Sequence, residues 1–545
     1  MNHGLVRVAL AAALLSAPAF AIDPAIKTTV IAQEGQTVVG VGNITSVFNL
    51  AVNSSGEHLV EVDTDNTDTT VDSVMFKNGV QFLREGQALA LPAGSTLDSF
   101  DAVNLNEAGK SGWNFFLDGT AGSNDDSGIY LDTNLLIQEG DASTIAGLTP
   151  GSLYLGFFET LMNDSDDILI RASMEDPNLG DTVDQVLFVR DASGTQTLVA
   201  IEDQAPPGFG GSGIVIDNLE SSAPEFGFNN AGDVLWACDT NAPTSQDTMI
   251  FLNTVLLARE GDPSPVAGRN WGSLTSPEMW VNDDGDTVIS TSLDSTDTST
   301  NAIIVKNGQK FIQEGDVPPE VAGGFTLSSF GTAPIKLTDR GAPTEDPDVL
   351  WWGDWNDGDT TIDSGLFLDS KLLLQEGIDM VGGVVIDTIQ SFGDAWDMSP
   401  DGRYILCELN LVGSIETALL LDLGPWEKLG QSLAGTTTPK LRAFGQLEAN
   451  TPTTIRVTNG IPGGTANLIV GLGQANVPLL GGTLVPTPDV IVFGLPLDGE
   501  GKLEFSATWP AGVPVGTKVT LQYWNDDAGA PFSYSASNAV VGTSQ

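Results

Sequence analysis

The sequence predicts an all-β protein, a seven-bladed β-propeller closed by its N-terminal strand and followed by a β-sandwich. Three observations lead to this fold class. A short apolar segment ending in Glu-Gly recurs, with one degenerate copy among seven, and no long amphipathic helical pattern is present. The repeat stops after Gly424, while short alternating strands continue to the C-terminus. The 545 residues exceed one ordinary core, so two or more domains are expected.

Each repeat contains an apolar strand that ends at a glutamate. The copies read VIAQEG, FLREG, LIQEG, LLAREG, FIQEG and LLLQEG, and LVAIED is the degenerate one. Self-similarity at a period of roughly 50–60 residues is typical of propeller blades. A residue that recurs in every unit usually supports the unit, so we expect these glutamates to bond backbone N–H groups of the adjoining loops. They are Glu34, Glu85, Glu139, Glu202, Glu260, Glu314 and Glu376.

A polar turn, usually Asn-x-x-Gly, lies between successive glutamates. Asn and Asp before Gly suit tight hairpins, because Gly adopts positive φ without strain. In the first repeat we expect four antiparallel strands, at residues 44–52, 58–62, 73–77 and 80–84. The seven turns begin at Asn53, Asn106, Asn163, Asn229, Asn282, Thr338 and Ser399.

The two ends of the repeat array complement each other. The first Glu-Gly strand, at residues 28–33, has no partner strands before it, and the last repeat has no Glu-Gly strand after it. The N-terminal strand is therefore expected to complete the last blade, which removes two exposed sheet edges. An open solenoid is the alternative architecture.

The segment after Gly424 has a different pattern. The Glu-Gly motif is absent, acidic residues are sparser, and about seven short strands fit into roughly 115 residues, which is typical of a β-sandwich. The predicted organisation is a signal peptide at residues 1–21, a propeller at 22–430 and a sandwich at 431–545.

The first residues have the pattern of a secretory signal peptide. Arg7 supplies the positive charge, residues 8–15 form a short apolar segment, and Ala19-Phe20-Ala21 is an A-x-A cleavage site. The mature chain is therefore expected to begin at Ile22 and to lie outside the cytoplasm. No other stretch is long enough for a transmembrane helix.

Histidine and cysteine are rare. The mature chain has one histidine, His58, which excludes a His-rich zinc site. Secretion would permit a disulfide between Cys238 and Cys407. These two residues occupy equivalent strands of the fourth and seventh repeats, nearly opposite in a ring, whereas bridged Cα atoms lie within about 7 Å. Two buried free thiols are expected.

The net charge of −51 makes nucleic acid an unsuitable partner, because phosphates would be repelled. It favours cations, basic partners or a saline medium. Two Asp-rich segments, DTDNTDTTVD and DWNDGDTTID, supply several oxygen ligands of the kind calcium takes. Turn formation without metal is the alternative, since both lack the glycine and final glutamate of an EF-hand. The candidate metal ligands are Asp63, Asp65, Asp68, Asp72, Asp354, Asp357, Asp359 and Asp363.

Trp355 is the candidate ligand-binding aromatic residue. It follows Trp351 and Trp352 and is expected in a loop, where an exposed indole can stack on a sugar ring. Trp351 or Trp352 is expected in the core, because adjacent strand residues face opposite sides of a sheet.

The repeats resemble those of secreted bacterial tandem-repeat proteins with an NxxG turn and an EGD-P loop. LLAREGDPSP at residues 256–265 and NDDG at 282–285 carry this resemblance. The C-terminal stretch is similar to a β-sandwich module of planctomycete secreted proteins, through VPLLGGTLVPTPD, LDGEGKLEF, LQYWNDD and SNAVVGT. The resemblance implies the architecture and no catalytic residues.

Two functions remain. The favoured one is a secreted, non-enzymatic binding or cell-surface protein whose acidic face takes calcium, a polysaccharide or a protein. The other is a polysaccharide-active hydrolase or lyase with carboxylates at the propeller centre. Arginine is scarce and the sialidase Asp-box is absent, and fold alone does not decide activity. A cluster of non-repeating residues in a central pocket would favour the enzyme.

Overall fold

The computed structural model describes residues 22–545 except 176–182, 220–225, 296, 333 and 344. The expected signal peptide lies outside the described residues. The described chain contains 43 strands, and its one helical element is a 3-10 turn at Pro531–Ser533. No helix in this described part is long and apolar enough to cross a membrane. The all-β prediction is confirmed.

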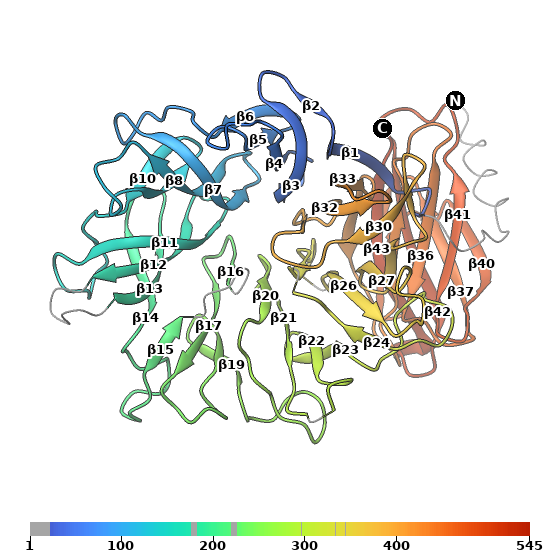
Figure 1. Ribbon diagram of the computed structural model, residues 1–545. Helices are drawn as coiled ribbons and strands as arrows, with labels where there is room; N and C mark the ends of the chain where they lie inside the picture. The colour runs from blue at the N-terminus through green and yellow to red at the C-terminus, as the bar shows by residue number, and fades with distance from the viewer. Residues whose placement is uncertain (1–21, 176–182, 220–225, 296, 333, 344) are drawn as a thin grey trace.

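Among the described residues, seven antiparallel sheets occupy the repeat region and are arranged around a common centre, a propeller-like fold (Figure 1). Sheet I contains β2 (Thr37–Val38), β3 (Gly42–Val52), β4 (His58–Thr64), β5 (Val74–Lys77) and β6 (Val80–Arg84). Sheet II contains β7 (Thr96–Leu105), β8 (Ser111–Asp118), β9 (Ser127–Leu131) and β10 (Asn134–Gln138). Sheet III contains β11 (Leu153–Met162), β12 (Ile168–Glu175), β13 (Val183–Arg190) and β14 (Gln196–Ile201).

The other four sheets repeat this meander. Sheet IV contains β15 (Ile216–Leu219), β16 (Gly227–Phe228), β17 (Val234–Thr240), β18 (Met249–Leu252) and β19 (Val255–Arg259). Sheet V contains β20 (Glu278–Val281), β21 (Thr287–Ser292), β22 (Ala302–Lys306) and β23 (Gln309–Gln313). Sheet VI contains β24 (Leu327–Ser329), β25 (Lys336–Leu337), β26 (Val349–Trp355), β27 (Ser364–Leu368) and β28 (Lys371–Gln375). Sheet VII contains β29 (Met380–Val381), β30 (Val384–Ile389), β31 (Trp396–Met398), β32 (Tyr404–Leu411), β33 (Ile415–Asp422) and β1 (Lys27–Gln33).

The first strand of the chain pairs with the last strand of the repeat region. β1 runs antiparallel to β33, with Lys27 opposite Asp422 and Gln33 opposite Thr417. Apolar side chains fill the spaces between neighbouring sheets. Leu59 of sheet I, for example, packs in one cluster with Trp113 and Phe115 of sheet II. The alternation of strand side chains thus gives each sheet two buried faces.

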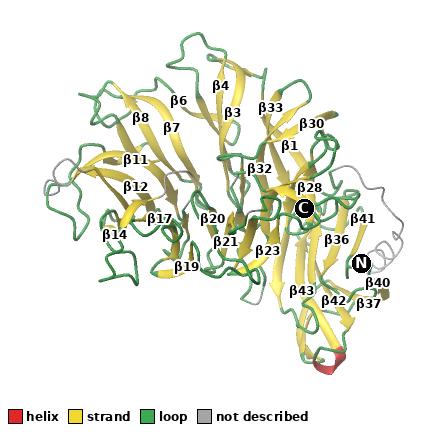
Figure 2. Ribbon diagram, turned by 60° about the horizontal axis from the view of Figure 1, so that its bottom comes forward, coloured by secondary structure: helices red, strands yellow, loops and turns green. Residues whose placement is uncertain are grey.

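Three further sheets form the C-terminal part beside sheets VI and VII (Figures 1 and 2). The five-stranded sheet has the order β34 (Trp426–Gly430), β43 (Tyr534–Thr543), β42 (Lys518–Asp526), β37 (Thr465–Gly471) and β40 (Val490–Pro496). The three-stranded sheet has the order β35 (Lys440–Phe444), β36 (Pro452–Thr458) and β41 (Leu503–Thr508). A hairpin of β38 (Gln474–Leu479) and β39 (Gly482–Pro486) is the third. Because β34 already pairs with β43, the C-terminal sheets include residues that precede the expected boundary at residue 430.

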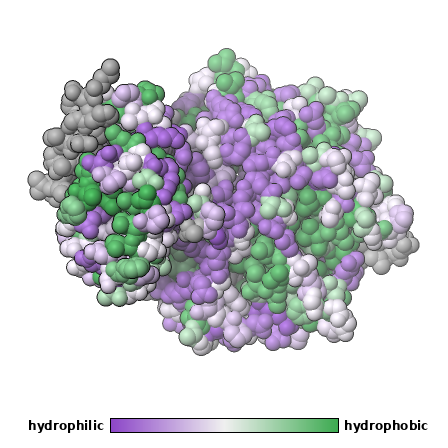
Figure 3. All heavy atoms as spheres, turned by 180° about the vertical axis from the view of Figure 1, so that it is seen from behind, coloured by the Kyte–Doolittle hydropathy of each residue, from purple (hydrophilic) through white to green (hydrophobic). Residues whose placement is uncertain are grey.

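One apolar cluster joins the two larger C-terminal sheets. Leu441 and Val457 of the three-stranded sheet lie in the same cluster as Leu521 and Val540 of the five-stranded sheet. Seen from behind, hydrophilic surface covers much of the middle of the molecule, while hydrophobic patches show both on the C-terminal lobe at the left and on the right-hand side (Figure 3).

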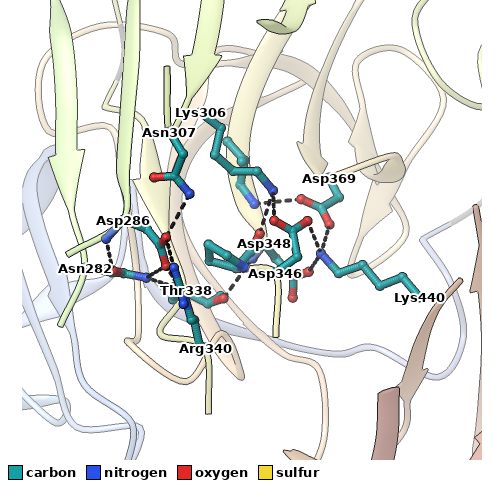
Figure 4. Close-up of polar contacts among 12 residues, drawn as sticks. Asn282, Asp286, Lys306, Asn307, Thr338, Arg340, Asp346, Asp348, Asp369 and Lys440 are labelled. Carbon is teal, nitrogen blue, oxygen red and sulfur yellow. Dashed lines mark hydrogen bonds and ion pairs between the residues drawn. The ribbon is translucent and has the colours of Figure 1, made fainter. Parts of the chain in front are cut away.

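A buried ion cluster joins sheet VI to the C-terminal part (Figure 4). The Asp348 carboxylate, whose side chain is 1% exposed, lies 2.6 Å from Lys440 Nζ and 2.8 Å from Lys428 Nζ. Arg442 also pairs with it. Lys440 makes a second ion pair with Asp369, at 2.5 Å. Three cations from the C-terminal strands therefore converge on one carboxylate of the ring.

Candidate functional site

A pocket of about 150 Å³ lies at the centre of the ring, and residues of all seven sheets line it. We call it the axial pocket. Its walls combine a layer that recurs in the repeats with side chains found in single sheets. Its charged lining residues are Glu107, Glu159, Asp164, Asp283, Lys336, Asp339, Asp394 and Asp397.

The Asn-x-x-Gly turns form the recurring layer of the axial pocket. In each of five sheets the Asn side-chain amide donates to the backbone carbonyl of the equivalent residue in the next sheet. The bonds join Asn53 to Asn106 (3.0 Å), Asn106 to Asn163 (3.5 Å), Asn163 to Asn229 (3.3 Å), Asn229 to Asn282 (2.8 Å) and Asn282 to Thr338 (2.8 Å), with the donor named first in each pair. The Asn Oδ1 atom meanwhile accepts N–H groups of its own turn, as Asn282 does from Asp284 and Asp286. The motif therefore joins neighbouring sheets as well as closing hairpins.

A second ring of contacts lies one residue further along these turns. Ser54 N–H donates to Glu107 (2.9 Å), and Glu107 N–H donates to Asp164 (2.8 Å). The pattern continues from Asp283 N–H to Asp339, at 3.0 Å. Burial raises the pKa of Asp339 to about 7, and the charges of Asp283, Asp284 and Asp164 add to the rise. This ring therefore presents crowded carboxyl groups to the pocket.

Among the described residues that line the pocket, Lys336 is the one cation. Its Nζ lies 3.1 Å from an Asp397 carboxylate oxygen and 3.7 Å from the centre of the Trp280 ring. The other Asp397 oxygen accepts the backbone N–H of Val52, at 2.8 Å. Asp397 is thus held on the pocket wall between an ammonium group and a backbone N–H donor.

Asp394 lies three residues before Asp397, in the turn that precedes β31. Burial raises the pKa of Asp394 above its usual range, against the nearby positive charge of Lys336, and the charges of Asp101 and Asp397 add to the rise. One pocket therefore combines a carboxyl group whose pKa is raised by burial with a carboxyl group paired to a cation. Such a division is what acid–base chemistry by two carboxyls requires.

The repeated glutamates lie away from this pocket, and six of the seven accept a hydrogen bond from the strand before their own or from the residue next to that strand. Glu85 accepts the backbone N–H of Ser73 at 3.0 Å, and Glu314 accepts that of Ala302 at 2.8 Å. Glu34, in contrast, is exposed. Glu202 likewise accepts the backbone N–H of Gln185, whereas Glu139, Glu260 and Glu376 accept the side-chain hydroxyls of Ser127, Thr248 and Ser364.

Three of these glutamates also share a site with an aspartate. Burial raises the pKa of Glu85, Glu139 and Glu260 to about 7 in each case. The neighbouring aspartates, Asp72 for the first, Asp126 for the second and Asp247 for the third, contribute to the rise. Paired carboxyls at close range favour sharing one proton over carrying two charges.

The structure brings together only part of the first candidate calcium segment. Asp63 and Asp72 lie near each other and near Glu85. Asp65 instead accepts the backbone N–H of Asn43 at 2.6 Å, and Asp68 accepts the Thr70 hydroxyl at 2.8 Å. Two of the four carboxylates are therefore engaged in local hydrogen bonds.

The second candidate segment behaves similarly. Asp354 accepts the hydroxyl of Ser328 and Asp359 that of Thr361, while Asp357 accepts the backbone N–H of Asp359 at 3.1 Å. Burial raises the pKa of Asp363, and the charge of Asp354 adds to the rise. Across the part of the chain that the structure describes, no three His, Cys, Asp or Glu residues form a group that could hold a metal ion.

The prediction that Trp355 is an exposed loop residue is wrong. It belongs to β26 instead of the following loop, is 1% exposed, and packs edge-on against Phe367 with 6.2 Å between ring centres. Trp351 faces the same side of the strand and stacks on the same ring at 4.3 Å. Because β26 extends through Trp355, the period-two alternation of the strand places this side chain in the core. The prediction of two buried free thiols, Cys238 and Cys407, is confirmed.

Comparison with known proteins adds one family match. Residues 7–221 match the family model described as "Family of unknown function (DUF7453)". The N-terminal part of the chain is similar to this family. No curated protein matches the chain.

Solved structures give weak similarities only. The polysaccharide lyase Uly1 shares 13% identity, with 71% of this chain and 90% of that chain covered and a TM-score of 0.27. A Penicillium chrysogenum α-L-arabinanase in complex with arabinobiose shares 12%, with 72% and 97% covered and a TM-score of 0.28. A Dyadobacter fermentans protein of unknown function shares 10%, with 73% and 100% covered and a TM-score of 0.26. Similarities at these TM-scores do not indicate a function.

Proposed function

We propose that the protein is a secreted hydrolase of neutral polysaccharides and that the axial pocket is its active site. The observation that carries this proposal is the non-repeating set of Asp394, Asp397, Lys336 and Trp280 on the wall of a pocket otherwise built from repeated turns. A repeat needs no such set for its own stability. Asp394 would act as the general acid, and Asp397 would act as the charged partner that activates water or stabilises the sugar cation.

The acidity of the pocket favours a hydrolase over a lyase. A lyase must hold the carboxylate of a uronic acid while it removes the neighbouring proton. Glu107, Asp164 and Asp283 on the same pocket walls would repel that carboxylate. A neutral sugar meets no such penalty, and its hydroxyl groups can donate to these oxygens.

The architectural part of the proposal is a seven-bladed β-propeller followed by a β-sandwich. Sheets I to VII would be the blades, and the pairing of β1 with β33 would close the ring in place of an open solenoid. The five-stranded and three-stranded C-terminal sheets, with their common apolar cluster, would be the two layers of the sandwich. Secretion follows from the signal-peptide pattern of residues 1–21.

The test is hydrolysis of neutral polysaccharides, measured as new reducing ends. Replacing Asp394 or Asp397 by asparagine is expected to lower kcat by about 10²–10⁴-fold, as removal of an acid–base group does. Glu500→Gln is the matched control, because this side chain is 72% exposed on a C-terminal turn. Activity of the parent protein should fall as the pH rises through the raised pKa of Asp394, because the acid then loses its proton. Unchanged rates in both variants would exclude the axial pocket as the active site.

A second candidate function is a calcium-dependent binding protein, favoured by the net charge of −51 and by the mutual repulsion of Asp63, Asp72 and Glu85. These three side chains do not form a metal site among the described residues, so calcium would act by offsetting their repulsion. Millimolar calcium is then expected to raise Tm at pH 8, and Asp63→Asn with Asp72→Asn should remove that rise. Magnesium at equal ionic strength is the control, and an equal rise with both ions would mean charge screening alone.

A further inference from the structure

The first residues after the predicted cleavage site are built into the body of the protein. Ala25 and Ile26 are 3% and 5% exposed, and Ile22 packs against the same apolar cluster. The Asp23 carboxylate accepts the N–H of Ala25 and the hydroxyl of Thr454, both at 3.0 Å. This short segment therefore contacts the C-terminal sheets immediately before β1 joins sheet VII.

A buried carboxylate lies at the backbone nitrogen of Ile22. Asp379, between β28 and β29, is 5% exposed and accepts the N–H of Gln375 at 2.6 Å. The backbone N–H of Ile22 also lies near this carboxylate and counteracts the effect of burial on its pKa. Burial raises the pKa of Asp379 to about 6, against the two N–H donors and the charge of Lys371.

Lys371 does not serve as a dedicated partner of Asp379. Its Nζ lies 3.0 Å from Glu504, 3.6 Å from Asp23 and 3.9 Å from Glu320. Within the described residues, no ion pair joins a lysine or arginine to Asp379. A buried carboxylate with hydrogen-bond donors and no cation of its own is an incomplete arrangement.

Cleavage after Ala21 would place a positive charge on the backbone nitrogen of Ile22, next to Asp379. Hydrolysis of the Ala21–Ile22 amide adds one water: its oxygen leaves with Ala21 as a carboxylate, and the Ile22 nitrogen becomes an ammonium group. An α-amino group ordinarily has a pKa of about 7.7–8.0, so it is charged at neutral pH. The atom that donates a neutral N–H to Asp379 in the precursor then donates as a cation.

We propose that Asp379 is the acceptor site for the processed N-terminus, and that an ion pair between the Ile22 ammonium and the Asp379 carboxylate fastens the segment that leads into β1. A charge-assisted hydrogen bond is roughly twice as strong as a neutral one, and burial strengthens it further. Removal of the signal peptide would thus stabilise the pairing of β1 with β33. The site depends on the register of processing, because one additional residue moves the ammonium away from Asp379.

The test compares two N-termini in the full-length protein. One form begins at Ile22, as secretion should produce, and the other retains Ala21 as its first residue. The extension is expected to lower Tm by about 3 °C or more. Asp379→Asn should lower Tm in the Ile22 form and have little effect in the extended form. Asp387→Asn, an exposed carboxylate on β30 of the same sheet, is the control.

Two results would overturn the proposal. The first is equal losses from Asp379→Asn in both forms, since no coupling would then exist between the carboxylate and the N-terminus. The second comes from the parent protein alone, where the pH dependence of N-terminal acylation gives the pKa of the Ile22 amine. We expect this pKa to lie above the denatured value, and an unshifted pKa, or a secreted chain that begins elsewhere, would contradict the site even if the variants do not fold.

Discussion

Replacing Asp348 by alanine is expected to destabilise the protein by about 3–5 kcal/mol, the usual cost of removing one partner from a buried ion cluster. Lys428, Lys440 and Arg442 would lose the carboxylate on which they converge. Burial already lowers the pKa of Lys428 to about 8, with the charge of Lys440 adding to the effect, and that of Arg442 to about 9. Without Asp348, these cations would be buried with too little negative charge. Equilibrium denaturation in urea measures the loss.

Asp346→Ala is the matched control for this prediction. Asp346 contacts Lys306 at 2.7 Å and Lys440 at 3.5 Å in the same cluster, but its side chain is 60% exposed. We expect a loss of less than about 1 kcal/mol, as for other exposed ion pairs. If the two variants lost equal stability, burial of Asp348 would not be the cause.

Lowering the pH from 8 to 5.5 is expected to raise Tm by about 3 °C or more, the reverse of ordinary acid denaturation. Glu85, Glu139 and Glu260 have pKa values of about 7 in the folded protein, above the ordinary value of 4.5. A group whose folded pKa is raised contributes stability that is fully present below its unfolded pKa and is lost as the pH rises through the folded pKa. The loss should therefore lie between about pH 4.5 and 7. Lys428, whose pKa burial lowers to about 8, acts in the opposite direction above this range.

Thermal unfolding across this pH range, at constant low ionic strength, checks the prediction. Glu139→Gln should flatten the profile, because the amide keeps a hydrogen-bonding shape and carries no charge beside Asp126. Glu34→Gln, at an exposed and unpaired position in the repeat, should leave the profile unchanged. A Tm that falls steadily from pH 8 to 5.5 would contradict the assignment of shared protons to these pairs.

Much of the β-structure could be predicted because it depends on local rules. Alternating apolar residues and Asn-Gly turns specify strands and hairpins, and each of the seven turns identified from sequence joins two paired strands of one sheet. The axial pocket was anticipated only in general terms. Lys336 and Asp397 are separated by 61 positions in sequence, and nothing local shows that a ring places them 3.1 Å apart.

The Asn amide bonds between neighbouring sheets and the position of Trp355 illustrate two other limits of prediction from sequence. The same Asn in five turns was a usable signal, but only the closed arrangement shows that each amide reaches the next sheet. The sequence predicts Trp355 in a loop because it belongs to the Asp-rich segment DWNDGDTTID, whereas β26 extends through it and the indole is buried. Side-chain direction at a strand end depends on a boundary that sequence patterns locate to within a few residues.

The pairing of β1 bears on how fast the fold would open. β1 pairs with β33 from Lys27 to Gln33, and β43 lies between β34 and β42 inside its sheet. Pulling on β1 would load several backbone hydrogen bonds of one strand at the same time. Unfolding would then be limited by the rate at which a strand is peeled away, so lifetime in a protease-rich medium would exceed what equilibrium stability alone suggests.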